Sequence, residues 1–271
     1  MTIAIVTDST TSLAPEVLER PDVRMVPLTF HFGSEETYTD KVDMSNEEFY
    51  ERLRDAEEFP TTSQPPAGAF VEAYESLSAY DDLLVLTVSR KLSGTYDSAL
   101  QAAGMVERPV EVVDTRNAEM GSGLILLEAL RVLDEGGEFK DVRRAAEAAA
   151  GRCNLYFAVG TLEYLAKSGR IGRAQRLVGT AFDVRPVLKL VDGEVVPHKR
   201  TRGRKRQMNA VLEEVKPAAE AGRPLYFGHI ATPEPVAELA ERLGVEGRPV
   251  AEIGGVVGSH VGLGAYGVAH L

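Results

Sequence analysis

Apolar and polar positions follow one repeated order along the first 120 residues: a short apolar strand, a polar loop and a helix. Apolar runs at 3–6, 23–29, 83–88 and 110–113 predict strands. Caps and i, i+3, i+4, i+7 spacing predict helices over 15–20, 45–55, 67–77, 95–105 and 118–133. Residues 29–39 predict a hairpin around Gly33-Ser34. Strands that alternate with helices predict parallel βαβ units in an open sheet.

The second half of the chain mixes hairpins with helices. Strands are predicted at 155–159, 225–230 and 249–253, and a hairpin over 184–196 turns at Asp192-Gly193. Helices are predicted at 141–152, 173–178, 204–221 and 235–243, with a short one from Thr161 to Ser168-Gly169. We therefore expect two α/β domains. Residues 1–150 would hold a mainly parallel, Rossmann-like sheet, and residues 151–271 a smaller mixed sheet with helices and a glycine-rich tail.

Composition narrows the class of protein. The chain is 44% apolar and 26% charged, which suits soluble domains with a large core. Its single cysteine, Cys153, excludes an internal disulfide, and without a CxxC motif structural zinc is not expected. The N-terminus has no basic, signal-like region, and no run approaches 18 apolar residues. We expect a cytoplasmic protein with no integral membrane contact.

Charge is unevenly distributed along the chain. The net charge is −11, yet residues 167–206 hold twelve Lys and Arg against three Asp and Glu. The overall charge, and the lack of interleaved aromatic residues, argue against nucleic-acid binding. The run Lys199–Arg206, with six cations in eight positions, fits either a solvated face or a docking patch for an acidic or phosphate-bearing partner.

Hydroxyl-rich loops are the first candidates for chemistry. They follow predicted strands at Asp8-Ser9-Thr10, Thr61-Thr62-Ser63, Ser89, Ser93-Gly94-Thr95 and Asp114-Thr115. Loops at the carboxyl edge of a parallel sheet bind ligands, and hydroxyls at helix N-termini can hold an anion. Because Ser and Thr are also ordinary N-caps, the alternative is a purely structural role. The implied ligand is a small anionic head group, a carboxylate or a phosphate.

The tail and the catalytic templates carry less information. Residues 262–267 match GxGxxG, but only four residues follow, so a dinucleotide site is not expected there. The glycines instead predict a close backbone approach to a ligand or another loop.

The common catalytic motifs GxSxG, GxxxxGK[ST] and HExxH are absent from the sequence. Ser93, His260 and an acid such as Asp8 or Asp114 would form a triad only if the fold brings them together, which the sequence alone does not show. The alternative function is an acyl or phosphoryl transferase that uses Ser93 or His260.

Taken in order, these segments resemble the DegV family of bacterial fatty-acid-binding proteins. The resemblance rests on matching segments spread over nearly the whole chain: Ile5–Thr10, Thr62–Pro65, Ser89–Thr95, Val113–Thr115, Leu165–Ile171, Lys199–Arg206 and the His260 tail. Leu263 departs from the family tail, which commonly reads His-x-Gly-Pro-Gly. The resemblance implies two α/β domains with one long-chain fatty acid, such as palmitate, between them, and a role in lipid transport or fatty acid metabolism.

The resemblance also assigns residues. It implies that Thr62 and Ser93 hold the fatty-acid carboxylate, with Ser63, Thr95 and His260 as further head-group candidates. It implies no catalytic residue, no metal and no cofactor other than the lipid itself. Some members present the bound acid to a fatty acid kinase. In that case Arg170, Arg173, Arg200 and Arg202 would form the docking surface.

Overall fold

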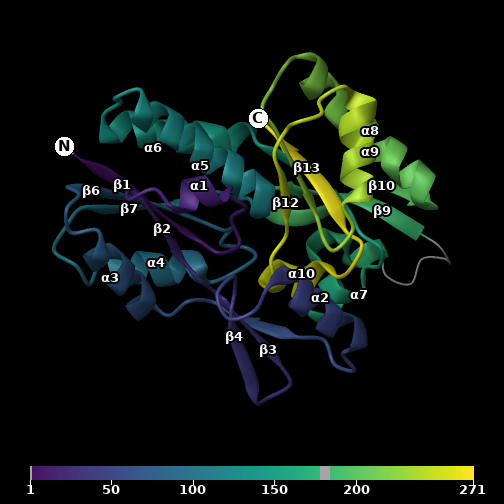
Figure 1. The fold of residues 1–271 in the computed structure, drawn as a ribbon, viewed down its shortest axis with the longest axis horizontal. Coiled ribbons are helices and arrows are strands. Elements are labelled where there is room, and N and C mark those ends of the chain that lie inside the picture. Colours follow the sequence, from purple (N-terminus) through teal and green to yellow (C-terminus); the bar gives the residue numbers. More distant parts are fainter. Residues whose placement is uncertain (1, 178–183) are drawn as a thin grey trace.

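The computed structural model describes residues 2–177 and 184–271, which fold into two large sheets with helices and a third, small sheet (Figure 1). The first sheet has the order β2-β1-β6-β7 and every neighbouring pair is parallel. Its strands are β1 (Ile3–Asp8), β2 (Val23–Val26), β6 (Asp82–Thr87) and β7 (Val110–Asp114). Every residue of the two central strands is buried, as their continuous apolar runs predict.

Helices cover both faces of this parallel sheet. On one face α3 (Ala67–Ser76) and α4 (Thr95–Ala103) enclose a core built on Val6, Phe70 and Leu83. On the other face lie α5 (Glu119–Asp134) and α6 (Phe139–Arg152), while the short α1 (Pro15–Leu18) packs beside β2. The predicted parallel α/β organisation is therefore confirmed.

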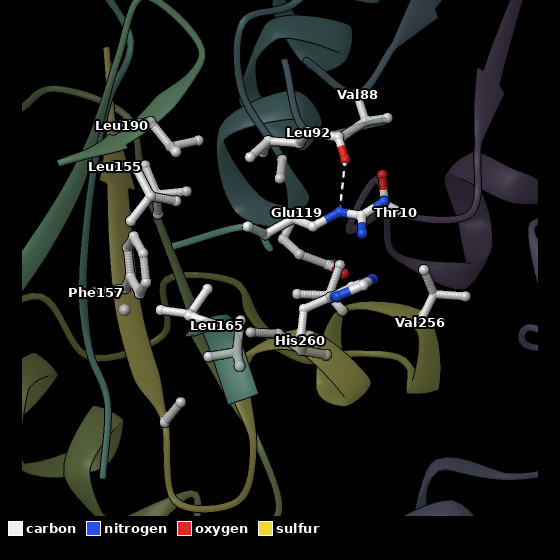
Figure 2. A pocket seen from close by; sticks show the side chains of 18 of the residues that line it. Thr10, Val88, Leu92, Glu119, Leu155, Phe157, Leu165, Leu190, Val256 and His260 are labelled. Carbon is white, nitrogen blue, oxygen red and sulfur yellow. Dashed lines mark hydrogen bonds between the residues drawn. The ribbon is translucent and has the colours of Figure 1, made fainter. Parts of the chain in front are cut away.

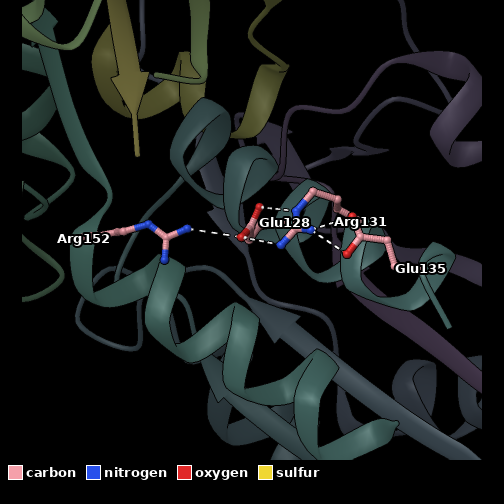
Figure 3. Close-up of polar contacts among 4 residues, drawn as sticks. All are labelled: Glu128, Arg131, Glu135 and Arg152. Atoms are coloured by element: carbon pink, nitrogen blue, oxygen red, sulfur yellow. Dashed lines mark hydrogen bonds and ion pairs between the residues drawn. The ribbon is translucent and has the colours of Figure 1, made fainter. Parts of the chain in front are cut away.

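Ion pairs join the two long helices (Figure 3). Glu128 of α5 lies 3.3 Å from Arg152 at the end of α6, and the Arg131 Nε lies 3.1 Å from the same carboxylate. Arg131 also reaches Glu135 at 2.7 Å. Exposed ion pairs contribute little individually, but Glu128 is only 19% exposed and so fixes the end of α6 against α5.

The small sheet corrects two of the predictions. Its antiparallel strands, in the order β4-β3-β5, are β3 (Thr29–Phe32), β4 (Glu36–Thr39) and β5 (Thr61–Ser63). The strand predicted over 23–29 is wrong in extent: it ends at Val26, because Pro27 has no N–H for the sheet. Residues 61–63, predicted as a loop of the parallel sheet, pair instead with β3. The hairpin around Gly33 is confirmed.

One amphipathic helix fixes this small sheet. Helix α2 (Asn46–Asp55) begins at a capping box in which Ser45 and Glu48 exchange hydrogen bonds, as its S-x-x-E sequence predicts. Phe49 of α2 packs against Phe30 of β3, with ring centroids 4.8 Å apart. Edge-on aromatic pairs of this kind stabilise the contact beyond simple area burial.

The second large sheet is mixed and has the order β10-β9-β8-β13-β11-β12. Its strands are β8 (Asn154–Ala158), β9 (Val184–Val191), β10 (Glu194–Arg202), β11 (Leu225–His229), β12 (Val250–Glu252) and β13 (Tyr266–His270). The β9–β10 hairpin turns at Asp192-Gly193, where both φ angles are positive, as predicted for a two-residue turn. Helices α8 (Arg204–Glu220) and α9 (Glu234–Leu243) cover one face, and α5 contacts β8, β11 and β13 on the other.

The glycine-rich tail forms regular secondary structure, which its sequence does not predict. It forms α10 (Gly255–Val261) and then β13, a middle strand of the mixed sheet. Glycine is needed for this packing, because a Cβ at Gly255 would lie 2.9 Å from the Phe49 ring and one at Gly258 2.8 Å from Tyr50. The predicted close approach is present at these two glycines, but its partner is the side chains of helix α2 and not a ligand or another loop.

Two short helices complete the fold, α7 (Glu163–Lys167) and η1 (Gly172–Leu177). The helix predicted over 173–178 corresponds to η1, and residue 178, the last residue of the prediction, lies outside the described residues. The predicted domain boundary at 150/151 falls in the last turn of α6 and stays a prediction. In the described part of the chain no helix is long and apolar enough to cross a bilayer.

Candidate functional site

A mainly apolar cavity lies between the two large sheets (Figure 2). It contains about 890 Å³ of empty space, part of it open to solvent. Both halves of the chain contribute apolar walls, among them Val88, Leu92, Leu155, Phe157, Leu165 and Leu190. This composition suits a ligand that is mostly hydrocarbon.

A polar group in the wall joins two of the predicted residues. Thr62 and His260 both line the cavity, and the Thr62 Oγ1 lies 2.9 Å from the His260 Nε2. Burial, together with the smaller effect of the nearby Arg170 charge, lowers the pKa of His260 to about 4. The imidazole is therefore neutral at pH 7, with one ring N–H available as a donor.

Ser93 also lines the cavity, and Thr95 holds it in place. The Ser93 Oγ lies 2.8 Å from the Thr95 Oγ1 and accepts a 3.3 Å hydrogen bond from the Thr95 N–H. Thr95 is fully buried and is not among the lining residues. It therefore positions Ser93 and does not reach the cavity itself.

Arg170 brings a positive charge to the cavity, a role that the sequence analysis missed. Its Nε donates to the Leu92 carbonyl at 3.1 Å and its Nη1 to the Ser168 carbonyl at 2.6 Å. A guanidinium has five N–H groups, so three further donors remain for an anion. Its signal in the sequence is the Lys-Ser-Gly-Arg segment, which predicts a docking loop and not a cavity residue.

Ser63 is a head-group candidate that the structure does not bring to the cavity. Successive side chains of a strand point to opposite faces, so Thr62 and Ser63 diverge. The exposed Ser63 hydroxyl lies 2.8 Å from the Nε2 of His31, away from the lining residues.

Three of the predicted docking residues lie on the surface. Arg200 and Arg202 are exposed on β10, and Arg173 lies on η1, which packs against β10. Arg173 is 58% exposed and lies 3.4 Å from Glu194. A docking role for this surface stays a prediction.

Nearby buried acids form a further feature that the sequence analysis missed. Glu119 is fully buried in the cavity wall, and the Ser12 hydroxyl donates to its Oε2 at 2.7 Å. Burial raises the pKa of Glu119 to about 7, against the opposing effect of Lys41. The pKa values of the buried carboxyls of Asp8 and Asp40 are raised for the same reason. Of the three acids only Glu119 lines the cavity, and its carboxyl titrates near neutral pH.

The geometry does not assemble the nucleophile and base of a transferase. The Ser93 Oγ is bonded to Thr95, whereas the His260 Nε2 is bonded to Thr62. Asp8 accepts from Thr10 and from the Val88 N–H, and Asp114 accepts from the N–H groups of Arg90 and Arg116. The two acids named for a triad are thus bonded elsewhere. Within residues 2–177 and 184–271, no cluster of three acidic, His or Cys side chains could hold a metal.

Gly94 allows the Thr62 and Ser93 segments to approach each other. A Cβ at this position would overlap the Oε1 of Gln64 and lie 2.7 Å from its Cδ, while the Gln64 Nε2 donates to Ser98 at 3.0 Å.

We expect Gly94→Ala to displace Gln64, break its hydrogen bond to Ser98 and weaken ligand binding about fivefold, near 1 kcal/mol. Titration of a labelled fatty acid measures this. Gly68→Ala, where a Cβ meets nothing within 4 Å, is the matched control and should bind normally; equal affinities for the two variants would contradict the prediction.

Comparisons with known proteins agree over the full chain. A family model described as an uncharacterised protein of the DegV family matches residues 2–271. A DegV domain-containing protein of Streptomyces coelicolor is 36% identical over 98% of this chain and 97% of its own length.

Two solved structures are similar over 100% of this chain and 99% of theirs. A DegV family protein from Thermus thermophilus, described by its fatty acid binding, has 37% identity and a TM-score of 0.91. DegV from Bacillus subtilis, described as a fatty acid binding protein, has 32% identity and a TM-score of 0.89.

Proposed function

The chain belongs to the DegV family, and on that premise we propose that it binds one long-chain fatty acid, such as palmitate, in the cavity between its two large sheets. The observation that carries this proposal is the combination of apolar walls with one arginine among the lining residues. An amphipathic ligand with a single negative charge matches both. The fatty acids bound by the Thermus thermophilus and Bacillus subtilis relatives support the same ligand class.

The acyl chain supplies most of the affinity. Burying each methylene contributes on the order of 0.8 kcal/mol, so a sixteen-carbon chain contributes roughly 11 kcal/mol before the costs of binding. A neutral hydrogen bond adds only about 1 kcal/mol. The polar residues therefore select the acid and fix its direction, while the apolar walls hold it.

The carboxylate lies against Arg170, Thr62 and Ser93 in this proposal. Arg170 supplies the charge and the Ser93 hydroxyl a further donor. The Thr62–His260 pair supplies one more, because the other of its two hydrogens is used in the bond between them. Assigning Arg170 to the head group replaces its predicted docking role, because its side chain contacts Leu92 beside Ser93.

The protein acts as a carrier in this proposal, in lipid transport or fatty acid metabolism, and not as an enzyme. The separation of Ser93 from His260 in the hydrogen-bond network supports this. Presentation of the bound carboxylate to a fatty acid kinase is the finer proposal, with Arg173, Arg200 and Arg202 as its docking surface. Their exposure on adjacent elements supports it.

Mass spectrometry of the purified protein tests the carrier function directly. We expect the native mass to exceed the chain mass by one fatty acid, and denaturation with solvent extraction to release that acid in a 1:1 ratio. The control is protein stripped of lipid and reloaded with palmitate, which should restore the mass difference. Failure to retain any acid from twelve to twenty carbons after reloading would refute the proposed function.

A further inference from the structure

Met120, the second residue of α5, fills a notch in the mixed sheet. Gly228 of β11 and Gly267 of β13 are directly paired across the two strands, so the sheet has no side chain at either position. A Cβ at Gly228 would overlap the Met120 Sδ and lie 2.8 Å from its Cε, and one at Gly267 would lie 3.3 Å from the same Cε. Glycine inside a strand commonly marks such a close approach. The Met120 thioether therefore packs directly against the backbone of β11 and β13.

The backbone of α5 is packed tightly on this side. A Cβ at Gly123 would overlap the Ser12 carbonyl oxygen and lie 3.1 Å from the Tyr226 ring of β11, so α5 lies as close to that loop and to the sheet as glycine permits. The Glu119 N–H also donates to the Thr10 carbonyl at 2.6 Å. Met has three rotatable side-chain bonds and fills irregular space readily. Its side chain is therefore the adjustable part of this wall.

Met120 and Gly267 both line the cavity, on the side formed by the mixed sheet. The proposed head-group residues come from elsewhere: Thr62 from β5, Ser93 from the loop after β6, Arg170 from the loop between α7 and η1, and His260 from α10. Figure 2 shows Leu155 and Phe157, on β8 beside β13, across the cavity from Leu92 and Thr10. A ligand whose head group binds near Ser93 directs its chain toward this sheet.

We propose that Met120, seated in the Gly228–Gly267 notch, sets the length of acyl chain that the cavity accepts. This inference rests on the proposed fatty acid function. When the Met120 thioether lies in the notch, the acyl chain can use the full length of the cavity. When the thioether is displaced from the notch, the Met120 side chain occupies the space that the last methylenes of the acyl chain would fill.

Gly228→Ala isolates this effect. The three atoms nearest to the new Cβ all belong to the Met120 side chain, so the substitution displaces that side chain and not the backbone. We expect the preference for an eighteen-carbon over a fourteen-carbon saturated acid to fall about fifteenfold, the equivalent of two methylenes. Met120→Ala should shift the preference toward longer acids by a similar factor. The double variant should return close to Met120→Ala, because no side chain is left to displace.

Met208→Ala is the matched control, since Met208 is buried in the separate core under α8 and does not line the cavity. It should lower thermal stability without changing the order of preference among twelve- to twenty-carbon acids. Competition binding with equimolar acid mixtures, analysed by mass spectrometry, measures that order for each variant. An unchanged order in Gly228→Ala and Met120→Ala, with wild-type protein still binding fatty acid, overturns the length-setting role alone. Loss of all acid binding in the wild type would instead overturn the proposed function and this inference together.

Discussion

Replacing Arg170 with methionine is expected to weaken binding of a long-chain fatty acid about thirtyfold, because a hydrogen bond to a charged group contributes roughly 2 kcal/mol. Binding of the corresponding fatty alcohol should change little, since the alcohol carries no charge for the guanidinium to neutralise. Methionine keeps a long apolar stem in the wall. The difference between acid and alcohol therefore reports the lost charge and not a general loss of packing.

The control for this prediction lies three residues away in the sequence. Arg173 is exposed and pairs with Glu194 at the surface, so Arg173→Met removes the same charge without touching the cavity. Calorimetric titration of both variants with palmitate and hexadecanol gives the four affinities required. If Arg173→Met lost as much acid affinity as Arg170→Met, the effect would be one of overall charge, and Arg170 would have no specific role at the head group.

The parallel sheet could be predicted because its signals are local. Apolar runs in β1 and β6, and the capping box at Ser45, depend on neighbours within a few residues. The tail could not be predicted in the same way. Its glycines form α10 only because Phe49 and Tyr50, some two hundred residues earlier, leave no room for a side chain. Glycine content alone indicates a close approach without naming the partner.

The site shows the same limit. Thr62 and Ser93 could be placed near a head group from their segments, and both line the cavity. Arg170 and Arg173 are indistinguishable in sequence, because each is an arginine in one glycine-rich basic stretch. Only the contact of Arg170 with the Leu92 carbonyl, across 78 residues, separates the inward from the outward charge. Glu119 was missed because nothing in its sequence neighbours predicts complete burial of an acid.

That buried acid leads to the second large effect: Glu119→Gln is expected to make the ligand-free protein more stable at pH 8. Burial raises the pKa of Glu119 from 4.5 to about 7, so the folded state holds its proton at pH values where the unfolded state has lost it. Stability from this proton is complete below pH 4.5 and is lost as the pH rises through 7. At 1.36 kcal/mol per pKa unit the loss is about 3 kcal/mol, and glutamine avoids it.

The measurement is the free energy of unfolding in urea at pH 4.5, 6, 7 and 8, taken as the difference between wild type and Glu119→Gln. The difference should favour the variant increasingly from pH 4.5 to 7 and level off above that. Asp8 and Asp40 titrate in both proteins, so their effects on stability largely cancel in the difference.

Glu36→Gln is the control of opposite sign, because the paired Arg52 lowers the pKa of Glu36 to about 2. Its contribution to stability is present above pH 4.5 and is lost as the pH falls. Parallel curves for wild type and Glu119→Gln would mean that the carboxyl is already ionised in the folded protein, with Lys41 compensating its burial.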